Sequence, residues 1–319
     1  MQVYQFHSII YFSSTLNFRG DYMNKKRVKI AFFDVDGTIS NEALTKAARK
    51  KQEMNGFISQ KEKADLYYLK RDYKSNRSDP TFFDTYVIRE TEILLDSLKG
   101  FRAFEIEELA KQVVEEYSHE VYIYSRNLIE TLKRKGFLLI AISGSPSFLV
   151  KAFAEKYGFY DYIGNGYQML PNGSYELCEP ITWENKDQIV NQLIKKHGWQ
   201  GKIDKMVSVG DTAGDFSMLE MADCPIAINP SRPLLLSIAE AAQKSKEKKW
   251  YYASERKDHI YQGTIPGDID EGGNIIIDNA KILLNGKSGI DFLVQRQQDE
   301  NLPESELLAT KIFKDNYSF

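Results

Sequence analysis

The chain has 319 residues, of which 42% are hydrophobic and 27% are charged, enough to bury one sizeable core and a smaller second unit. Its formal net charge of −3 gives no argument for a nucleic-acid partner, and no apolar run approaches the roughly 20 residues that span a bilayer. The two cysteines have no metal-ligand spacing, so we expect a reduced, cytoplasmic protein without a membrane partner. The composition does not indicate an oligomeric state.

The chain begins with residues 1–27, which we expect to be a poorly ordered extension. Their short apolar patch at residues 9–12 follows no basic segment, which argues against a signal peptide. Residues 28–34 (VKIAFFD) are nearly all apolar, which is typical of a strand covered on both faces. From residue 41 to residue 119, apolar side chains recur at three- and four-residue spacing, which predicts helices.

Beyond residue 120, strands and helices are expected to alternate. Apolar runs at residues 137–143, 205–211 and 224–229 predict buried strands, and amphipathic segments between them predict helices. Residues 160–178 contain a Pro-Asn-Gly turn between two short candidate strands. Residues 261–274 are rich in glycine and are interpreted as a loop.

This order of elements predicts the α/β class, with a doubly wound parallel sheet. The core would consist of residues 28–40 and 120–242. Residues 41–119 would be a helical cap inserted after the first strand, and residues 243–319 a C-terminal extension that is partly loop.

Three of the predicted strands end in polar residues. These ends are DVDGT at residues 34–38, SGS at residues 143–145 and GDTAGD at residues 210–215. Ligands of α/β sheets bind outside the carboxyl ends of the strands, so we expect the three ends to share one crevice.

Carboxylates gathered in one crevice repel each other unless a cation joins them. Oxygen ligands without histidine or thiolate suit Mg²⁺. We therefore predict a magnesium site at the strand ends, with Asp211 and Asp215 facing the same pocket as Asp34.

A phosphate bound at such a metal needs further partners. Ser143 offers a hydroxyl, and the amide of Gly144 can approach because glycine leaves room. Lys186, near the start of a predicted helix, offers a positive charge, although a helix lysine usually faces solvent.

Asp34 and Asp36 alternate along an extended chain, so both side chains can flank one phosphoryl group. Asp34 is the candidate nucleophile, and Asp36 is the candidate proton donor to the leaving alcohol. A pair of acids after a strand, taken alone, is more often a turn with helix-capping residues.

The ordered set DVDGT, ISGSP, Lys186 and GDTAGD resembles the four motifs of the haloacid-dehalogenase-like phosphatases and covers roughly residues 28–230. The helical insertion resembles the first-type cap of that superfamily. The segments AISGSPSFLV and GDTAGDFSMLEMAD are most similar to its phosphoserine-phosphatase-like branch. The resemblance implies a magnesium-dependent phosphomonoester hydrolase for a small phosphorylated metabolite, with an aspartyl-phosphate on Asp34 and acid/base work by Asp36.

The resemblance also implies where the ligands bind. Mg²⁺ would be held by Asp34, the carbonyl of Asp36 and Asp211, with Asp215 and Thr38 in supporting positions. Ser143, Gly144 and Lys186 would bind the phosphoryl group.

Two alternatives stay open at this stage. A phosphomutase or phosphotransferase uses the same motifs, and a relative without turnover could bind a phosphorylated ligand. Asp36 argues against a dehalogenase, the lack of long apolar runs against a transport ATPase, and the short gap between Ser143 and Lys186 against the large second-type cap.

Charge is distributed unevenly in the predicted cap. Residues 46–77 contain ten Lys or Arg and four Asp or Glu, whereas residues 84–120 contain ten acids and four bases. The two halves could be solvated helix faces that pair with each other, or the basic half could overhang the crevice and steer phosphorylated substrates inward. Arg89, Glu90 and Glu92 could contact a substrate, but a charged helix face explains them equally well.

Overall fold

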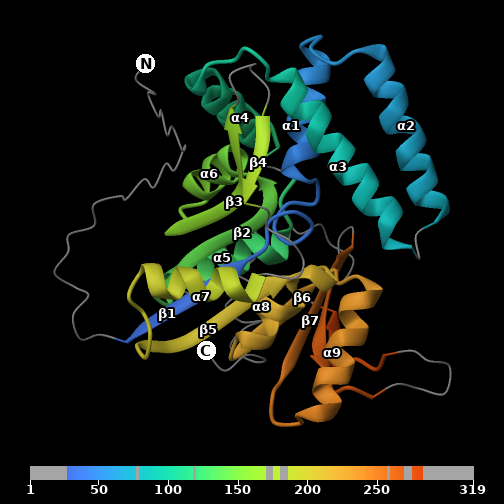
Figure 1. Ribbon diagram of the computed structural model, residues 1–319. Helices are drawn as coiled ribbons and strands as arrows, with labels where there is room; N and C mark the ends of the chain where they lie inside the picture. The colour runs from blue at the N-terminus through green and yellow to red at the C-terminus, as the bar shows by residue number, and fades with distance from the viewer. Residues whose placement is uncertain are drawn as a thin grey trace, which may run out of the picture.

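The computed structural model describes residues 27–76, 79–117, 120–169, 175–179, 186–256, 259–268 and 275–282. Its strands form a nine-stranded sheet in the order β4-β3-β2-β1-β5-β6-β7-β8-β9 (Figure 1). The six central strands, from β3 to β7 in this order, are parallel, and β4, β8 and β9 pair antiparallel with their neighbours. The strands are β1 (Val28–Phe33), β2 (Phe137–Pro146), β3 (Asp161–Met169), β4 (Tyr175–Glu179), β5 (Ile203–Gly210), β6 (Cys224–Ile228), β7 (Trp250–Arg256), β8 (His259–Ile265) and β9 (Asp278–Ile282).

Helices cover both faces of this sheet, which confirms the doubly wound α/β class. Helices α5 and α6 share a buried cluster with Phe33 of β1, whereas α7 and α8 share a separate cluster with its neighbour Phe32. Among the residues described, no helix is long and apolar enough to cross a membrane. The helices are α1 (Leu44–Met54), α2 (Gln60–Ser75), α3 (Pro80–Ser97), α4 (Ala103–Tyr117), α5 (Ile123–Arg134), α6 (Ser147–Lys156), α7 (Lys186–Lys196), the short 3₁₀ turn η1 (Ala213–Asp215), α8 (Phe216–Met221) and α9 (Arg232–Lys244).

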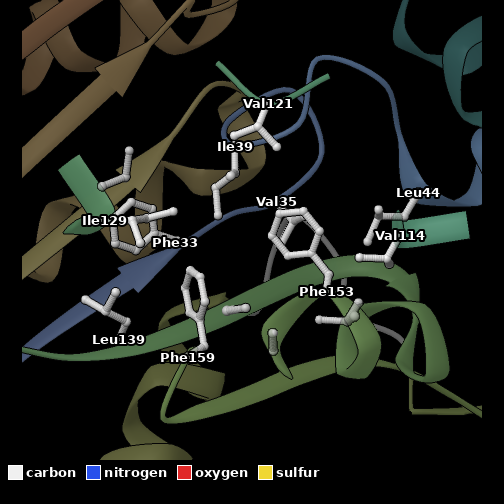
Figure 2. Close-up of a cluster of buried hydrophobic side chains, with 14 of the residues drawn as sticks. Phe33, Val35, Ile39, Leu44, Val114, Val121, Ile129, Leu139, Phe153 and Phe159 are labelled. Atoms are coloured by element: carbon white, nitrogen blue, oxygen red, sulfur yellow. The ribbon is translucent and has the colours of Figure 1, made fainter. Parts of the chain in front are cut away.

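The segment that follows β1 is anchored in the core. Phe33 and Val35 are fully buried and lie in one hydrophobic cluster with Leu44, the first residue of α1 (Figure 2). Side chains alternate along an extended chain, so Asp34 and Asp36 are turned away from this cluster. The core therefore fixes the direction of both carboxylates.

Helices α1 to α4 are an insertion whose two ends lie side by side. The amide of Asn41 donates to the carbonyl oxygen of Glu120 at 2.9 Å, and the amide of Tyr122 donates to that of Ile39 at 2.9 Å. This arrangement confirms the inserted helical cap. Helices α1 and α4 contribute to the main core, as does Leu94 of α3. Helices α2 and α3 project as a pair (Figure 1) and share a small cluster of their own.

The end of the described chain departs from the sequence prediction. The prediction of a loop at residues 261–274 is wrong for residues 261–265. These residues belong to β8, which pairs with β7 and β9. Residues 269–274 and the predicted Pro-Asn-Gly turn lie outside the described residues, as do residues 1–26. Strand β7 also contacts α5, because the carboxylate of Glu255 accepts hydrogen bonds from the amides of Ile123 at 3.1 Å and Tyr124 at 2.8 Å.

Candidate active site

The three polar strand ends lie together, as predicted. Strand β1 lies between β2 and β5, and its last residue, Phe33, is paired with Ala141 on one side and Val209 on the other. The amide of Asp34 continues this pairing by donating to the carbonyl oxygen of Val209 at 2.9 Å. Because the three strands are parallel, their carboxyl ends open at one edge of the sheet.

Asp34 is buried at this edge, with 6% of its surface exposed. Its Oδ1 accepts a hydrogen bond from Nζ of Lys186 at 2.6 Å. Burial raises the pKa of Asp34 to about 7; Lys186 opposes the rise, and the carboxylates of Asp215 and Asp36 add to it. A cation beside Asp34 would favour its ionised form.

Lys186 is the first residue of α7, and its side chain does not face solvent. Its Nζ lies 2.5 Å from Oδ1 of Asp215 as well as 2.6 Å from Oδ1 of Asp34. Burial alone would lower the pKa of Lys186, but the carboxylates of Asp215 and Asp34 raise it above the usual value. The lysine therefore stays charged between two acids.

Asp211 follows β5 and faces the loop after β1. Its Oδ1 accepts a hydrogen bond from Oγ1 of Thr38 at 2.9 Å. Burial, Asp34 and Asp215 raise the pKa of Asp211 well above its usual range. Gly37 has a φ of +88°, and a Cβ there would lie 2.3 Å from Oδ2 of Asp211, so this close approach requires glycine.

Asp215 is fully buried, and both of its carboxylate oxygens have partners. Oδ1 accepts from Lys186, and Oδ2 accepts from the amide of Asp211 at 3.0 Å and from the amide and hydroxyl of Thr212 at 2.9 and 3.1 Å. A Cβ on Gly210 would lie 2.4 Å from Cβ of Asp215, which explains the glycine. Asp215 therefore holds the loop that carries Asp211.

The carboxylates of Asp34, Asp211 and Asp215 form a group that can hold a metal ion, with one oxygen of each within 4.8 Å of the others. Carboxylate oxygens are the ligands that Mg²⁺ prefers. The raised pKa values of Asp34 and Asp211 fit such an ion, because Lys186 alone leaves the group with excess negative charge. Since Asp215 is already bound through both oxygens, Asp34 and Asp211 are the better direct ligands.

The carboxylate of Asp36 is held by a different set of donors. Oδ1 accepts from the amide of Leu44 at 2.7 Å, and Oδ2 accepts from the hydroxyls of Ser143 at 2.7 Å and Ser145 at 2.8 Å. The hydroxyl of Ser145 lies 3.0 Å from that of Thr45. Asp36 thereby joins the start of the cap to the end of β2.

Ser143 and Gly144 have different surroundings at the end of β2. The hydroxyl of Ser143 is buried; it donates to Asp36 and accepts from the amide of Ser145 at 2.9 Å. Gly144 is exposed, and its carbonyl oxygen accepts from Nδ2 of Asn165 at 2.6 Å. The Ser143 hydroxyl is thus already engaged within the protein.

A family model for haloacid dehalogenase-like hydrolases matches residues 31–220, more than half of the chain. The chain belongs to this family. The matched segment contains the end of β1, the cap, β2, Lys186 and the loop that carries Asp211 and Asp215. A search of the curated proteins found no match to this hydrolase.

Several solved structures are similar to this haloacid dehalogenase-like hydrolase. A protein of unknown function from Bordetella pertussis Tohama I has a TM-score of 0.55 at 19% identity, covering 69% of this chain and 97% of that chain. A phosphoserine phosphatase in its apo form has a TM-score of 0.44 at 20% identity, covering 67% and 91%. A probable phosphoserine phosphatase from Vibrio cholerae has a TM-score of 0.44 at 15% identity, covering 66% and 59%. At 19% identity, the likeness to the Bordetella pertussis protein shows the fold alone.

Ser143 was expected to bind phosphate, whereas its hydroxyl donates to Asp36 in the structure, and none of the donors around Asp36 was predicted as such. Ser145 had a signal, because it lies two residues after Ser143 on an extended strand and therefore on the same side. Leu44 and Thr45 had none, because their positions depend on where α1 begins relative to β2. Such a contact between distant segments leaves no pattern in the local sequence.

Proposed function

We propose that this chain is a magnesium-dependent phosphomonoester hydrolase that acts on a small phosphorylated metabolite through an aspartyl-phosphate intermediate. The observation that carries the proposal is the buried carboxylate of Asp34, paired with Lys186 and grouped with Asp211. Membership of the haloacid dehalogenase-like hydrolases supports a hydrolytic reaction.

In the proposed first step, a carboxylate oxygen of Asp34 attacks the phosphorus atom of the ester. The bond from phosphorus to the ester oxygen breaks, and Asp36 donates a proton to that oxygen as the alcohol leaves. In the second step, water attacks the phosphorus atom and gives its proton to Asp36. The bond between Asp34 and phosphorus breaks, which releases inorganic phosphate.

Two further residues are proposed to bind the phosphoryl group, and Ser143 is proposed to act through Asp36 in place of the phosphate contact expected from the sequence. The Lys186 ammonium would balance its charge, and the exposed backbone at Gly144 would contact it through the amide. Ser143 would orient Asp36, to which its hydroxyl is bonded, at the edge of the same site.

Mg²⁺, when bound, would neutralise the phosphate and the acidic group around Asp34. Asp34, Asp211 and the carbonyl oxygen of Asp36 are the proposed ligands. Thr38 supports the proposed site through its hydrogen bond to Asp211, and Asp215 supports it by holding the loop.

The test is hydrolysis of 4-nitrophenyl phosphate by the purified chain with Mg²⁺ and with EDTA. We expect turnover with Mg²⁺ only, and acid quenching with a ³²P-labelled substrate should leave label on the protein. Activity that requires a bisphosphate activator would favour a phosphomutase instead. Binding of phosphate esters without turnover would favour a non-catalytic relative.

A further inference from the structure

Four lysines of the cap lie close together, and few carboxylates pair with them. We call Lys46 and Lys50 of α1 and Lys70 and Lys74 of α2 the lysine cluster. Lys46 and Lys50 both bond Oε1 of Glu42, with Lys50 at 2.6 Å. Within the described part of the chain, neither Lys70 nor Lys74 forms an ion pair, and both are exposed.

Two members of the lysine cluster, Lys46 and Lys50, lie on α1, the helix whose first amide bonds Asp36. Helices α1 and α2 run in opposite directions, and an ion pair of 3.3 Å between Glu53 and Lys63 joins them near their connection (Figure 1). Lys70 and Lys74 therefore lie toward the start of α1, where the amide of Leu44 bonds Asp36. With a rise of about 1.5 Å per residue, the two α1 lysines lie only about 3 and 9 Å farther along the helix axis than Leu44.

The α2–α3 pair is fixed in place by buried contacts. Nε of Arg49 in α1 lies 3.1 Å from Oε1 of Glu90 in α3, and the hydroxyl of Tyr86 donates to the same oxygen at 3.0 Å. The ring of Tyr73 in α2 stacks on Tyr86 with an interplanar angle of 10°. The lysines are therefore presented by a defined surface of the cap.

Other charged side chains of the cap form ion pairs, as expected if its basic and acidic halves pair with each other. Arg49 bonds Glu90, Lys51 bonds Glu116, and Arg89 bonds Glu92 and Asp65. These contacts make Arg89, Glu90 and Glu92 structural residues of the helix surfaces. They leave the lysine cluster as a region of excess positive charge.

This excess has a cost in the folded chain. Burial lowers the pKa of Lys70, and the positive charges of Lys46 and Lys74 lower it further. Like charges one helical turn apart, as in Lys46 and Lys50 or Lys70 and Lys74, also weaken a helix. An anion bound among the four ammonium groups would remove these repulsions.

We propose that the lysine cluster binds a second phosphate group of the substrate, so that the preferred substrates are bisphosphorylated small molecules. The inference rests on the proposed function, in which the first phosphate lies at Asp34. A phosphate dianion suits the cluster better than a carboxylate, because it carries two charges and three acceptor oxygens for several ammonium donors.

The experiment measures binding without turnover. The chain is titrated calorimetrically in EDTA with α,ω-alkanediol bisphosphates of increasing length and with the matching alkyl monophosphates. We compare Lys70→Gln/Lys74→Gln with Lys61→Gln/Lys111→Gln, a control that removes two exposed lysines elsewhere on the cap. We expect at least one bisphosphate to bind about tenfold more tightly than its monophosphate, a gain of about 1.4 kcal/mol. The gain should be lost in the first variant and kept in the control.

Several outcomes would overturn the inference. One is that no bisphosphate binds more tightly than its monophosphate, and another is that the gain survives in Lys70→Gln/Lys74→Gln. A third is that this variant weakens the binding of both ligand types equally and only at low ionic strength, since the lysines would then attract any anion without a specific contact.

Hydrolysis of the same ligands with Mg²⁺ separates the inference from the proposed function. Tighter binding of a bisphosphate without hydrolysis would support the second phosphate site and contradict the proposed phosphatase activity. Hydrolysis without tighter binding would support the phosphatase activity and contradict the second phosphate site.

Discussion

The Nζ atom of Lys186 lies 2.6 Å from Oδ1 of Asp34, although 152 positions separate the two residues in the chain. The contact joins the end of β1 to the start of α7. Both groups are buried, so the charge of Asp34 is stabilised by Lys186, and the charge of Lys186 is stabilised by Asp34 and Asp215. A substitution at this contact therefore changes the charge balance of the site as well as its chemistry.

We expect Asp34→Asn to lower turnover by a factor of about 10³ or more, because the amide keeps the shape but cannot attack phosphorus. The thermal midpoint without metal should change little, because two effects oppose each other. The variant removes a carboxylate whose ionised form burial disfavours, but it also removes the charge of one of the two partners of the buried Lys186. Steady-state kinetics and differential scanning fluorimetry measure the two effects. Asp72→Asn, at a partly exposed position of α2, is the matched control. Retention of about a tenth of the activity would rule out the covalent route.

The pH dependence of stability should reverse when Mg²⁺ is added. The pKa of Asp34 is raised to about 7, so between about pH 4 and pH 7 the folded chain binds more protons than the unfolded chain. The metal-free chain should therefore lose stability as pH rises through this window, and Asp211 should act in the same direction. Mg²⁺ binds the ionised forms, so it should raise the thermal midpoint more at about pH 8 than at about pH 5.

Thermal melts of the chain and of Asp34→Asn, with and without Mg²⁺, test this pH dependence. The slope of the metal-free midpoint against pH should be smaller in the variant. An equal effect of Mg²⁺ at both pH values would contradict the prediction.

Asp211 and Asp215 should respond differently to replacement by Ala. Asp211→Ala should raise the Mg²⁺ concentration for half-maximal activity by about tenfold or more, with little loss of stability, because it removes a direct ligand. Asp215→Ala should lower the free energy of unfolding by about 3 kcal/mol, because it removes one of two partners of the buried Lys186 and frees the loop amides. Magnesium titrations of activity and urea denaturation measure the two effects. A larger loss of metal affinity in Asp215→Ala, at unchanged stability, would show that the two roles are reversed.

Gly37 and Gly56 form a matched pair for testing the approach to Asp211. Both have positive φ, +88° and +82°, but only at Gly37 would a Cβ meet another group, Oδ2 of Asp211 at 2.3 Å. Each replacement by Ala should cost about 1–2 kcal/mol of stability through backbone strain. Only Gly37→Ala should also raise the Mg²⁺ requirement for activity. If Gly56→Ala raises it equally, the close approach to Asp211 is not what makes glycine necessary.

The sequence predicted the parts of the site that lie at the ends of regular elements. Asp34 and Asp211 each follow an apolar strand, and Lys186 begins an amphipathic helix, so the parallel topology was enough to bring them together. The alternation of Phe33, Asp34, Val35 and Asp36 likewise predicted which side chains enter the core, and the buried cluster around Phe33 and Val35 agrees with it.

The remaining features depend on contacts between distant segments. Residues 261–265 were interpreted as a loop because the stretch 261–274 is rich in glycine, yet pairing with β7 on one side and β9 on the other makes them a strand. The bond from the Leu44 amide to Asp36 likewise depends on where α1 begins relative to the loop after β1. Neither kind of contact has a local pattern that could predict it.

Strand β7 limits how far the chain can be shortened at its C-terminal end without loss of the fold. A clone that ended with the segment matched by the family model, at residue 220, would lack β6 to β9 and would leave β5 as an open sheet edge. A clone that ended after α9 would keep β6 but lose Glu255, and the first amides of α5 would lose their acceptor. Because α5 begins one residue after Tyr122, whose amide bonds the carbonyl oxygen of Ile39, that loss would reach the loop that carries Asp34 and Asp36. The shortest clone expected to fold therefore extends past the boundary that sequence similarity suggests, through β8.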